Sequence, residues 1–258
     1  MTGAVARLGA RSVDWVAGLG HMTRFAGSVV AAALRPPLRG RTLVREIYDV
    51  GVRSLALILG SGFVVGMVLG LQAYNTLARF GAEQSLGAVV GLSLIRELGP
   101  VLTGLLVTGR AGSATAAGIG AMVTTGQLDG LRMMSISPIH FVVYPKALAL
   151  LIAMPLLSAL FIVVGVFGGY VVVVELLGLD PGSYLSSLEN AVDFRDDVLA
   201  SVLKGVVFGL LAGLISTYRG YTSEPTAEGV SRSTTSTVVV ASVCILISNY
   251  FITALWGV

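Results

Sequence analysis

The chain has 258 residues, of which 55% are hydrophobic and only 12% charged, and its mean hydropathy is +0.86. Soluble domains carry roughly 25% charged residues, so these values exclude a soluble globular protein and indicate an all-α polytopic membrane protein. The net charge is only +3, a single cysteine excludes an internal disulfide, and two widely separated histidines argue against a metal site.

Residues 1–50 predict an amphipathic helix rather than a membrane span. Polar or small residues form one helical stripe: Arg7, Arg11, Asp14, Gly18 and His21. Apolar residues occupy the other faces: Leu8, Trp15, Leu19, Met22 and Phe25. Such a helix lies in the membrane interface; the alternative is a partly disordered tail. Charges also interrupt the first apolar stretch, which argues against a cleavable signal peptide.

A spanning helix needs about 20 mostly apolar residues. Five segments meet this requirement: about 55–74, 86–109, 147–174, 198–218 and 238–258. Pro155 is expected to kink the third span, and Lys204 lies near one end of the fourth. The chain thus divides into an N-terminal cytoplasmic or interfacial region, 1–50, and a membrane domain, 51–258.

The loop charges predict the orientation. Residues 1–50 contain seven arginines and three acids, whereas 175–197 contain six acids and only Arg195. Positively charged loops stay in the cytoplasm. The N-terminus and the loops at 110–146 and 219–235 are therefore expected inside, with the acidic loop and the C-terminus outside.

Small residues recur every fourth position in three places: Gly62, Gly66 and Gly70; Gly112, Ala116 and Gly120; and Gly205, Gly209 and Gly213. This spacing lets another helix backbone come close. It predicts a tightly packed bundle, with a dimer contact as one use of these faces. A bulky side chain at Gly66 or Gly209 is expected to disturb assembly. The absence of an internal repeat counts against repeat-built secondary transporters.

Arg96 and Glu97 are adjacent charges in the second apolar run. Neighbouring helix residues point in different directions and do not pair with each other, so each needs its own partner. Charges at this depth usually mark a pathway or a binding site. We expect Arg96 to brace the bundle and Glu97 to meet a cavity. The alternative is an interhelical ion pair that only fixes packing.

The cytoplasmic segment 125–140 predicts a short amphipathic helix that ends before Pro138. Leu128, Leu131 and Met134 recur at helical spacing, with Gln127, Asp129 and Arg132 between them. The helix either lies on the membrane or docks into a partner. No phosphate loop, zinc-protease motif or nucleophile elbow occurs in the sequence. The chain is therefore expected not to be an enzyme, and any ATP would be bound by another chain.

In this setting, the stretch RELGPVLTGLLVTGRAGSATAA from Arg96 resembles the signature of the MlaE/YrbE permease family, the membrane subunit of ABC transporters that work with MCE proteins. The resemblance covers nearly the whole chain. It includes YDVGVRSL from Tyr48, GMVLGLQAY from Gly66, residues 127–138, NAVDFRDD from Asn190 and GVSRSTT from Gly229.

The resemblance implies a homodimer of five-span subunits in the inner membrane of a Gram-negative cell, moving phospholipid between inner and outer membranes to maintain outer-membrane asymmetry. Implied partners are an MlaF-like ATPase that binds ATP and Mg²⁺, an MlaB-like STAS protein on that ATPase, and a hexameric MlaD-like MCE protein. No nucleic acid and no cofactor of the chain itself are implied. The implied lipid cavity at the dimer interface is lined by Leu69, Tyr74, Leu77, Phe80, Glu97 and Leu98. The implied ATPase contact comprises Gln127, Leu128, Asp129, Leu131, Arg132 and Met134.

The sequence departs from the family pattern at several positions. Gly118 and Gly126 replace frequent acids, Val123 and Ser236 stand near or at positions that are often basic, and Asn249 replaces a frequent Asp. The missing acids put the polar contacts with the ATPase in question. Two other functions remain open: a non-transporting scaffold that anchors an MCE ring, and an ion-coupled secondary transporter that uses Glu97 as a proton site.

Overall fold

The computed structural model describes residues 2–33 and 40–256, with side chains from residue 17 on except that of residue 19. The described residues form helices joined by short turns, and no strand occurs among them. The α-helices are α1 (Thr2–Ala33), α2 (Gly40–Gly51), α3 (Leu55–Leu77), α4 (Leu86–Ser93), α5 (Gly99–Val107), α6 (Ser113–Thr124), α7 (Gln127–Met133), α8 (Tyr144–Tyr170), α9 (Pro181–Ala191), α10 (Leu199–Tyr221) and α11 (Ala227–Trp256).

Short 3₁₀ and π turns connect several of these helices. The 3₁₀ turns are η1 (Val52–Ser54), η2 (Ala78–Phe80) and η3 (Glu83–Ser85). The π turns, which contain one extra residue per turn, are η4 (Leu94–Leu98), η5 (Thr108–Gly112), η6 (Ile139–Val143), η7 (Val171–Leu176) and η8 (Phe194–Val198).

Five continuous helical segments are long and apolar enough to cross a membrane: Gly40–Phe80, Glu83–Thr124, Ile139–Leu176, Phe194–Tyr221 and Ala227–Trp256. The prediction of an all-α membrane protein with five spans is therefore confirmed. The segments extend beyond the predicted limits because polar helical turns continue the apolar ones. Residues 257 and 258 of the predicted last span lie outside the described residues.

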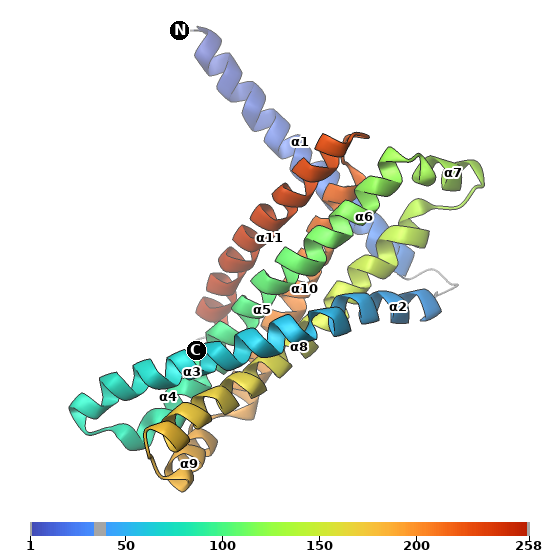
Figure 1. Ribbon diagram of the computed structural model, residues 1–258. Coiled ribbons are helices and arrows are strands. Elements are labelled where there is room, and N and C mark those ends of the chain that lie inside the picture. The colour runs from blue at the N-terminus through green and yellow to red at the C-terminus, as the bar shows by residue number, and fades with distance from the viewer. Residues whose placement is uncertain (1, 34–39, 257–258) are drawn as a thin grey trace.

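The bundle has two distinct ends (Figure 1). The helix α7 lies at one end, whereas α9 and the turn between α3 and α4 lie at the other. The long helix α8 packs against both α3 and α10. The main core cluster contains residues of all five spans, among them Ile58, Leu94, Phe161, Phe208 and Ile245.

Glycines allow the helix backbones to approach closely within this single chain. A Cβ atom at Gly66 of α3 would overlap the carbonyl oxygen of Gly165 in α8. A Cβ atom at Gly209 of α10 would lie 2.9 Å from the carbonyl oxygen of Leu150 in α8. The predicted tight packing is confirmed, and these glycine faces are occupied by neighbouring helices of the same chain. Gly205 lies against Pro155, through which α8 continues.

We expect Gly66→Ala to destabilise the chain by about 1–3 kcal/mol, because overpacking forces two backbones apart. Gly60→Ala is the matched control on the same helix, since no atom lies within 4 Å of its added Cβ. Thermal unfolding of both variants in detergent measures the effect. Equal melting temperatures for Gly66→Ala and Gly60→Ala would contradict the packing assignment.

Hydrogen bonds from charged side chains hold helix α2 against the spans. Lys146 Nζ of α8 donates to both carboxylate oxygens of Glu46 at 2.9 Å. Arg110 Nη1 donates to the carbonyl oxygen of Asp49 at 2.9 Å and to Ser54 Oγ at 3.0 Å. These bonds hold the start of the first span against the second and third.

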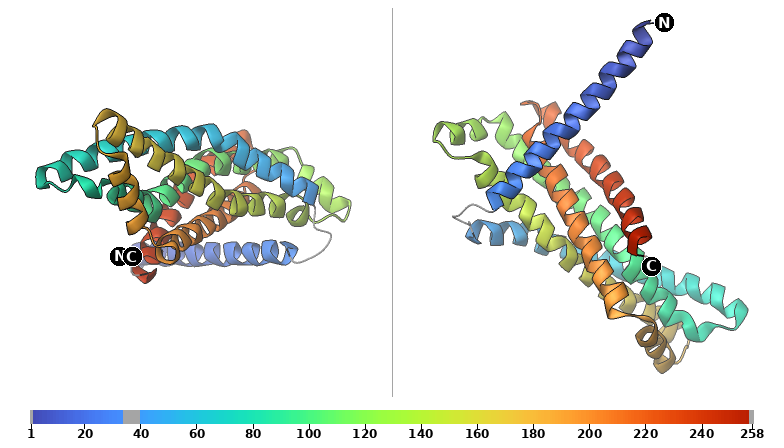
Figure 2. Two further views of the ribbon diagram at one scale, coloured as in Figure 1. Left: turned by 90° about the horizontal axis from the view of Figure 1, so that it is seen from below. Right: turned by 180° about the vertical axis from the view of Figure 1, so that it is seen from behind.

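The helix α1 contacts one end of the bundle and projects beyond it (Figure 2). Phe25 and Val29 are buried in a cluster with Val143 and Ala147. Met22, on the predicted apolar side of the helix, is partly buried, whereas Gly18 and His21 of the predicted polar stripe are exposed. The side chains of Arg7, Leu8, Arg11, Asp14, Trp15 and Leu19 lie outside the described residues, so the interfacial placement stays a prediction.

Candidate functional site

Arg96 and Glu97 lie in the π turn η4, where the helical hydrogen bonding of the second span changes register. Such turns are frequent at functional sites. Pro100 follows at the start of α5 and has no N–H to donate to the carbonyl oxygen of Arg96 four residues earlier. Lys204 Nζ of α10 donates to that oxygen at 2.5 Å. Because Pro100 leaves this carbonyl oxygen without its usual helical donor, the oxygen can accept a hydrogen bond from a lysine of another helix.

The guanidinium of Arg96 binds Asp197 at the beginning of the fourth span. Arg96 Nε donates to Asp197 Oδ1 at 2.6 Å, and the Asp197 side chain is fully buried. The second oxygen, Asp197 Oδ2, accepts the backbone N–H of Asp193 at 2.8 Å. A buried carboxylate needs both a cation and hydrogen bonds. Arg96 therefore connects the second span with η8, and its role as a brace of the bundle stays a prediction.

Glu97 belongs to a separate network that joins three spans. Its Oε1 accepts bonds from Lys204 Nζ at 2.9 Å and from Thr253 Oγ1 at 2.8 Å. Its Oε2 accepts Asn249 Nδ2 at 2.6 Å. Lys204 Nζ also donates to Thr253 Oγ1 at 2.8 Å, so its three hydrogens are all used. The network connects η4 with α10 and α11.

The two carboxylates differ in exposure. The Lys204 side chain is 4% exposed, whereas that of Glu97 is 39% exposed, unlike the fully buried Asp197. Glu97 therefore has a buried cation on one side and an accessible face on the other. The expectation that Arg96 and Glu97 take different partners is confirmed. Whether the open face of Glu97 meets substrate stays a prediction.

Sequence reasoning missed four members of these networks: Asp197, Lys204, Asn249 and Thr253. Lys204 carried a signal, because a lysine within an apolar run needs a partner. Asp197 belongs to the acidic loop and ends the NAVDFRDD stretch, but neither pattern indicated its pairing with Arg96. Asn249 was noted only as the replacement of a frequent Asp, and Thr253 carried no clear signal, since neutral polar residues are common in membrane helices.

The residues expected to line a lipid cavity do not surround Glu97 within the single chain. Leu69 and Leu98 pack against the main core cluster. Tyr74 and Leu77 pack at the α9 end, against a cluster that contains the fully buried Tyr184. Phe80 is exposed at the turn between α3 and α4. A cavity shared by these residues would require surfaces beyond one chain, so their role stays a prediction.

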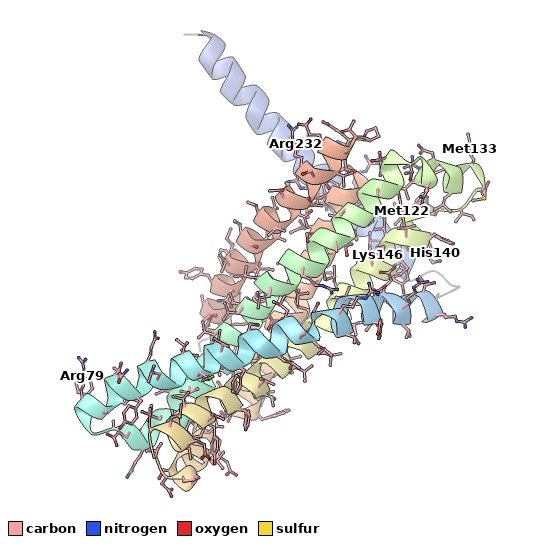
Figure 3. The ribbon with its side chains drawn as sticks, viewed as in Figure 1. Arg79, Met122, Met133, His140, Lys146 and Arg232 are labelled. Atoms are coloured by element: carbon pink, nitrogen blue, oxygen red, sulfur yellow. The ribbon has the colours of Figure 1, made fainter. Side chains whose placement is uncertain are left out.

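The predicted helix at 127–134 is present as α7, with one face toward the bundle. Leu128 is 4% exposed and packs with Leu131 against Ile119 and Val142. Met133, by contrast, is 90% exposed at the tip of the molecule (Figure 3). The two leucines therefore attach α7 to the bundle and point away from any partner that approaches from outside.

The exposed side of α7 combines polar side chains with two methionines, Met133 and Met134. Gln127, Asp129, Arg132 and Met134 are exposed. Arg132 Nη1 donates to Asp129 Oδ1 at 2.6 Å, and Nη2 donates to Tyr221 Oη at 2.7 Å. The Tyr221 bond, with a smaller contribution from Asp129, raises the pKa of Arg132. Tyr221 also contacts Phe25 of α1, so one ring joins α7, α10 and α1.

Comparison with known proteins identifies the family. The model of the family described as Permease MlaE matches residues 43–255. The intermembrane phospholipid transport system permease protein MlaE of Haemophilus influenzae is 44% identical over 97% of this chain and 96% of its own length. A probable ABC transporter permease protein of Rickettsia felis is 41% identical over 96% of both chains. In Arabidopsis thaliana, the chloroplastic protein trigalactosyldiacylglycerol 1 is 32% identical over 89% of this chain and 65% of its own length. The five spans, the Arg96–Glu97 turn and these matches together establish that the chain belongs to the MlaE permease family.

Proposed function

We propose that the chain is the permease subunit of an ABC transporter that moves phospholipids between the inner and outer membranes and so maintains the lipid asymmetry of the outer membrane. One observation carries the proposal: a half-exposed Glu97 is held by a buried Lys204 inside the bundle of a chain 44% identical to a phospholipid transport permease. Ionisable groups at this depth are costly and typically serve a pathway.

The proposed assembly is a homodimer in the bacterial inner membrane with a cytoplasmic N-terminus and a periplasmic C-terminus. An MlaF-like ATPase with bound ATP and Mg²⁺, carrying an MlaB-like protein, would contact the α7 end. A hexameric MlaD-like MCE protein would contact the α9 end. The position of α7 and α9 at opposite ends supports this arrangement, as do the arginine-rich and acidic segments of the sequence.

A photo-crosslinking experiment tests phospholipid passage. A benzophenone side chain is placed at Phe80, one of the proposed lipid contacts, and at Leu156, an exposed residue of α8 that serves as control. We expect phospholipid crosslinking at Phe80 to change when the complex with its ATPase hydrolyses ATP, while crosslinking at Leu156 to surrounding lipid stays constant. Identical ATP responses at both positions would favour a scaffold that carries no lipid.

We expect Asp129→Lys to reduce co-purification of the ATPase on the order of tenfold, the size typical of one central interface residue. Asp129 is exposed on α7. It is a better position for a charge reversal than Arg132, because Arg132 also donates a hydrogen bond to Tyr221 within the chain. Arg79→Glu, an exposed charge reversal at the opposite end, is the control. Full ATPase retention by Asp129→Lys, with the chain correctly inserted, would support a helix that lies on the membrane.

A further inference from the structure

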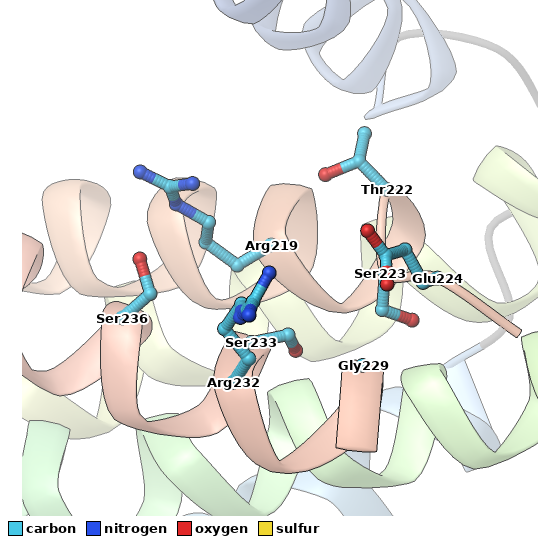
Figure 4. Close-up of a pocket in the computed structure, with 8 residues that line it drawn as sticks. All are labelled: Arg219, Thr222, Ser223, Glu224, Gly229, Arg232, Ser233 and Ser236. Carbon is cyan, nitrogen blue, oxygen red and sulfur yellow. The ribbon is translucent and has the colours of Figure 1, made fainter. Parts of the chain in front are cut away.

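A polar cavity of about 170 Å³ lies where α10 turns into α11, at the same end of the bundle as α7 (Figure 4). Arg219 of α10 and Arg232 of α11 line it together with Glu224 of the connecting turn. Two cations and one carboxylate therefore face a single small space. None of the side chains that line it is aromatic or aliphatic, so the cavity suits a polar group.

Several donors in this cavity are unused. Ser233 is 8% exposed, and its buried hydroxyl has no hydrogen-bond partner among the described residues. Within the same part of the chain, neither Arg219 nor the Ser236 hydroxyl makes a hydrogen bond or ion pair, and Arg232 makes only a 3.9 Å contact with Glu228. A buried hydroxyl without a partner is unfavourable. After a rotation of the Ser233 side chain, a ligand oxygen in the cavity would satisfy this hydroxyl, while the arginines neutralise the ligand's charge.

Glu224 is exposed, and its carboxylate has no cation partner among the described residues. A Cβ atom at Gly229 would lie 2.6 Å from the Glu224 carbonyl oxygen, so the turn is pressed against the first turn of α11. The hydroxyls of Thr222 and Ser223 donate to backbone carbonyls and do not compete for it. An anion alone would be repelled by this carboxylate. A ligand with an ammonium group beside its phosphate would satisfy both signs of charge.

We propose that this cavity binds the zwitterionic head group of phosphatidylethanolamine, with the phosphate on Arg219, Arg232 and Ser233 and the ammonium on Glu224. A primary ammonium donates hydrogen bonds to a carboxylate, whereas a quaternary ammonium has no N–H and prefers aromatic rings. That the bound head group belongs to a lipid rests on the proposed function. The cavity borders the end of the fourth candidate span, and the ends of spanning helices meet the head-group region of a bilayer.

The test measures binding and not transport, so its failure is distinct from failure of the proposed function. The full-length chain in detergent receives equal amounts of short-chain phosphatidylethanolamine and phosphatidylglycerol, and native mass spectrometry counts both bound lipids. Phosphoethanolamine and inorganic phosphate are added as soluble competitors. We expect the wild type to prefer phosphatidylethanolamine about tenfold, the size of one charge-assisted hydrogen bond, and phosphoethanolamine to compete better than phosphate.

Variants separate the two charges. Glu224→Gln should abolish the preference, and Arg219→Gln with Arg232→Gln should weaken binding of both lipids. Ser233→Ala should reduce binding without loss of melting temperature, because it removes an unpaired hydroxyl, and it serves if the double arginine variant does not fold. Arg79→Gln and Glu83→Gln, at the opposite end, are controls. An unchanged lipid ratio in Glu224→Gln, equal competition by phosphate and phosphoethanolamine, or full binding by the folded arginine or serine variant would overturn the proposal.

Discussion

Arg96→Ala is expected to destabilise the folded chain by about 3 kcal/mol, because it leaves the fully buried Asp197 carboxylate without its cation. The remaining backbone N–H of Asp193 satisfies only one of the two oxygens. The loss should appear as a lower melting temperature and a lower yield of folded protein.

A second substitution isolates the buried charge as the cause. Asp197→Asn in the Arg96→Ala background removes that charge and should recover a large part of the lost stability, which a double-mutant cycle measures. Arg53→Ala is the control, because its ion pair with Asp49 is exposed and contributes roughly 0.5 kcal/mol or less. A loss for Arg96→Ala no larger than for Arg53→Ala would refute the bracing role.

Lys204→Met is expected to have the second large effect. It removes one buried ammonium and leaves the Arg96 carbonyl oxygen, Glu97 and Thr253 each short of a hydrogen-bond donor. We expect the chain to lose about 2–3 kcal/mol of stability. This is a small loss for a broken buried ion pair, because Glu97 is partly open to solvent. Lipid transport by equal amounts of folded complex should fall as well.

Combining Lys204→Met with Glu97→Gln distinguishes a packing role from a transport role. The pair removes both charges. The glutamine oxygen can accept from Thr253, and its NH₂ can donate to Asn249 Oδ1 once that amide flips, so stability should largely return. If the charge of Glu97 serves transport, activity stays low despite the restored stability. Recovery of both stability and transport would show that the network only fixes packing.

The membrane plan was predictable from the sequence because hydropathy alone reports long apolar helices. The limits of the spans were not. Helix α2 continues into the first span although it is polar, because Lys146 pairs with Glu46 and Arg110 donates to the backbone carbonyl oxygen of Asp49, and both partners lie far along the chain. The glycine spacing correctly indicated close packing, but whether the neighbouring helix belonged to the same chain required the structure.

The site was predictable in part. Arg96 and Glu97 stand out because charges in an apolar run are rare, and their different directions follow from helix geometry. Their partners lie about a hundred residues away, as Asp197 and Lys204 do, and no local pattern encodes such pairings. The periodicity of α7 identified Leu128 and Leu131 as one face but could not tell that this face packs inward.

We propose that ATP hydrolysis by a partner chain drives phospholipid past Glu97. Reconstitution of the complex in liposomes, with fluorescent phospholipid and an acceptor MCE protein, measures this directly. We expect lipid transfer that requires ATP, is lost with a non-hydrolysable analogue, and falls severalfold in Glu97→Gln at equal amounts of folded complex. Transfer that proceeds equally without ATP, or ATP-dependent transfer that Glu97→Gln leaves unchanged, would contradict this mechanism.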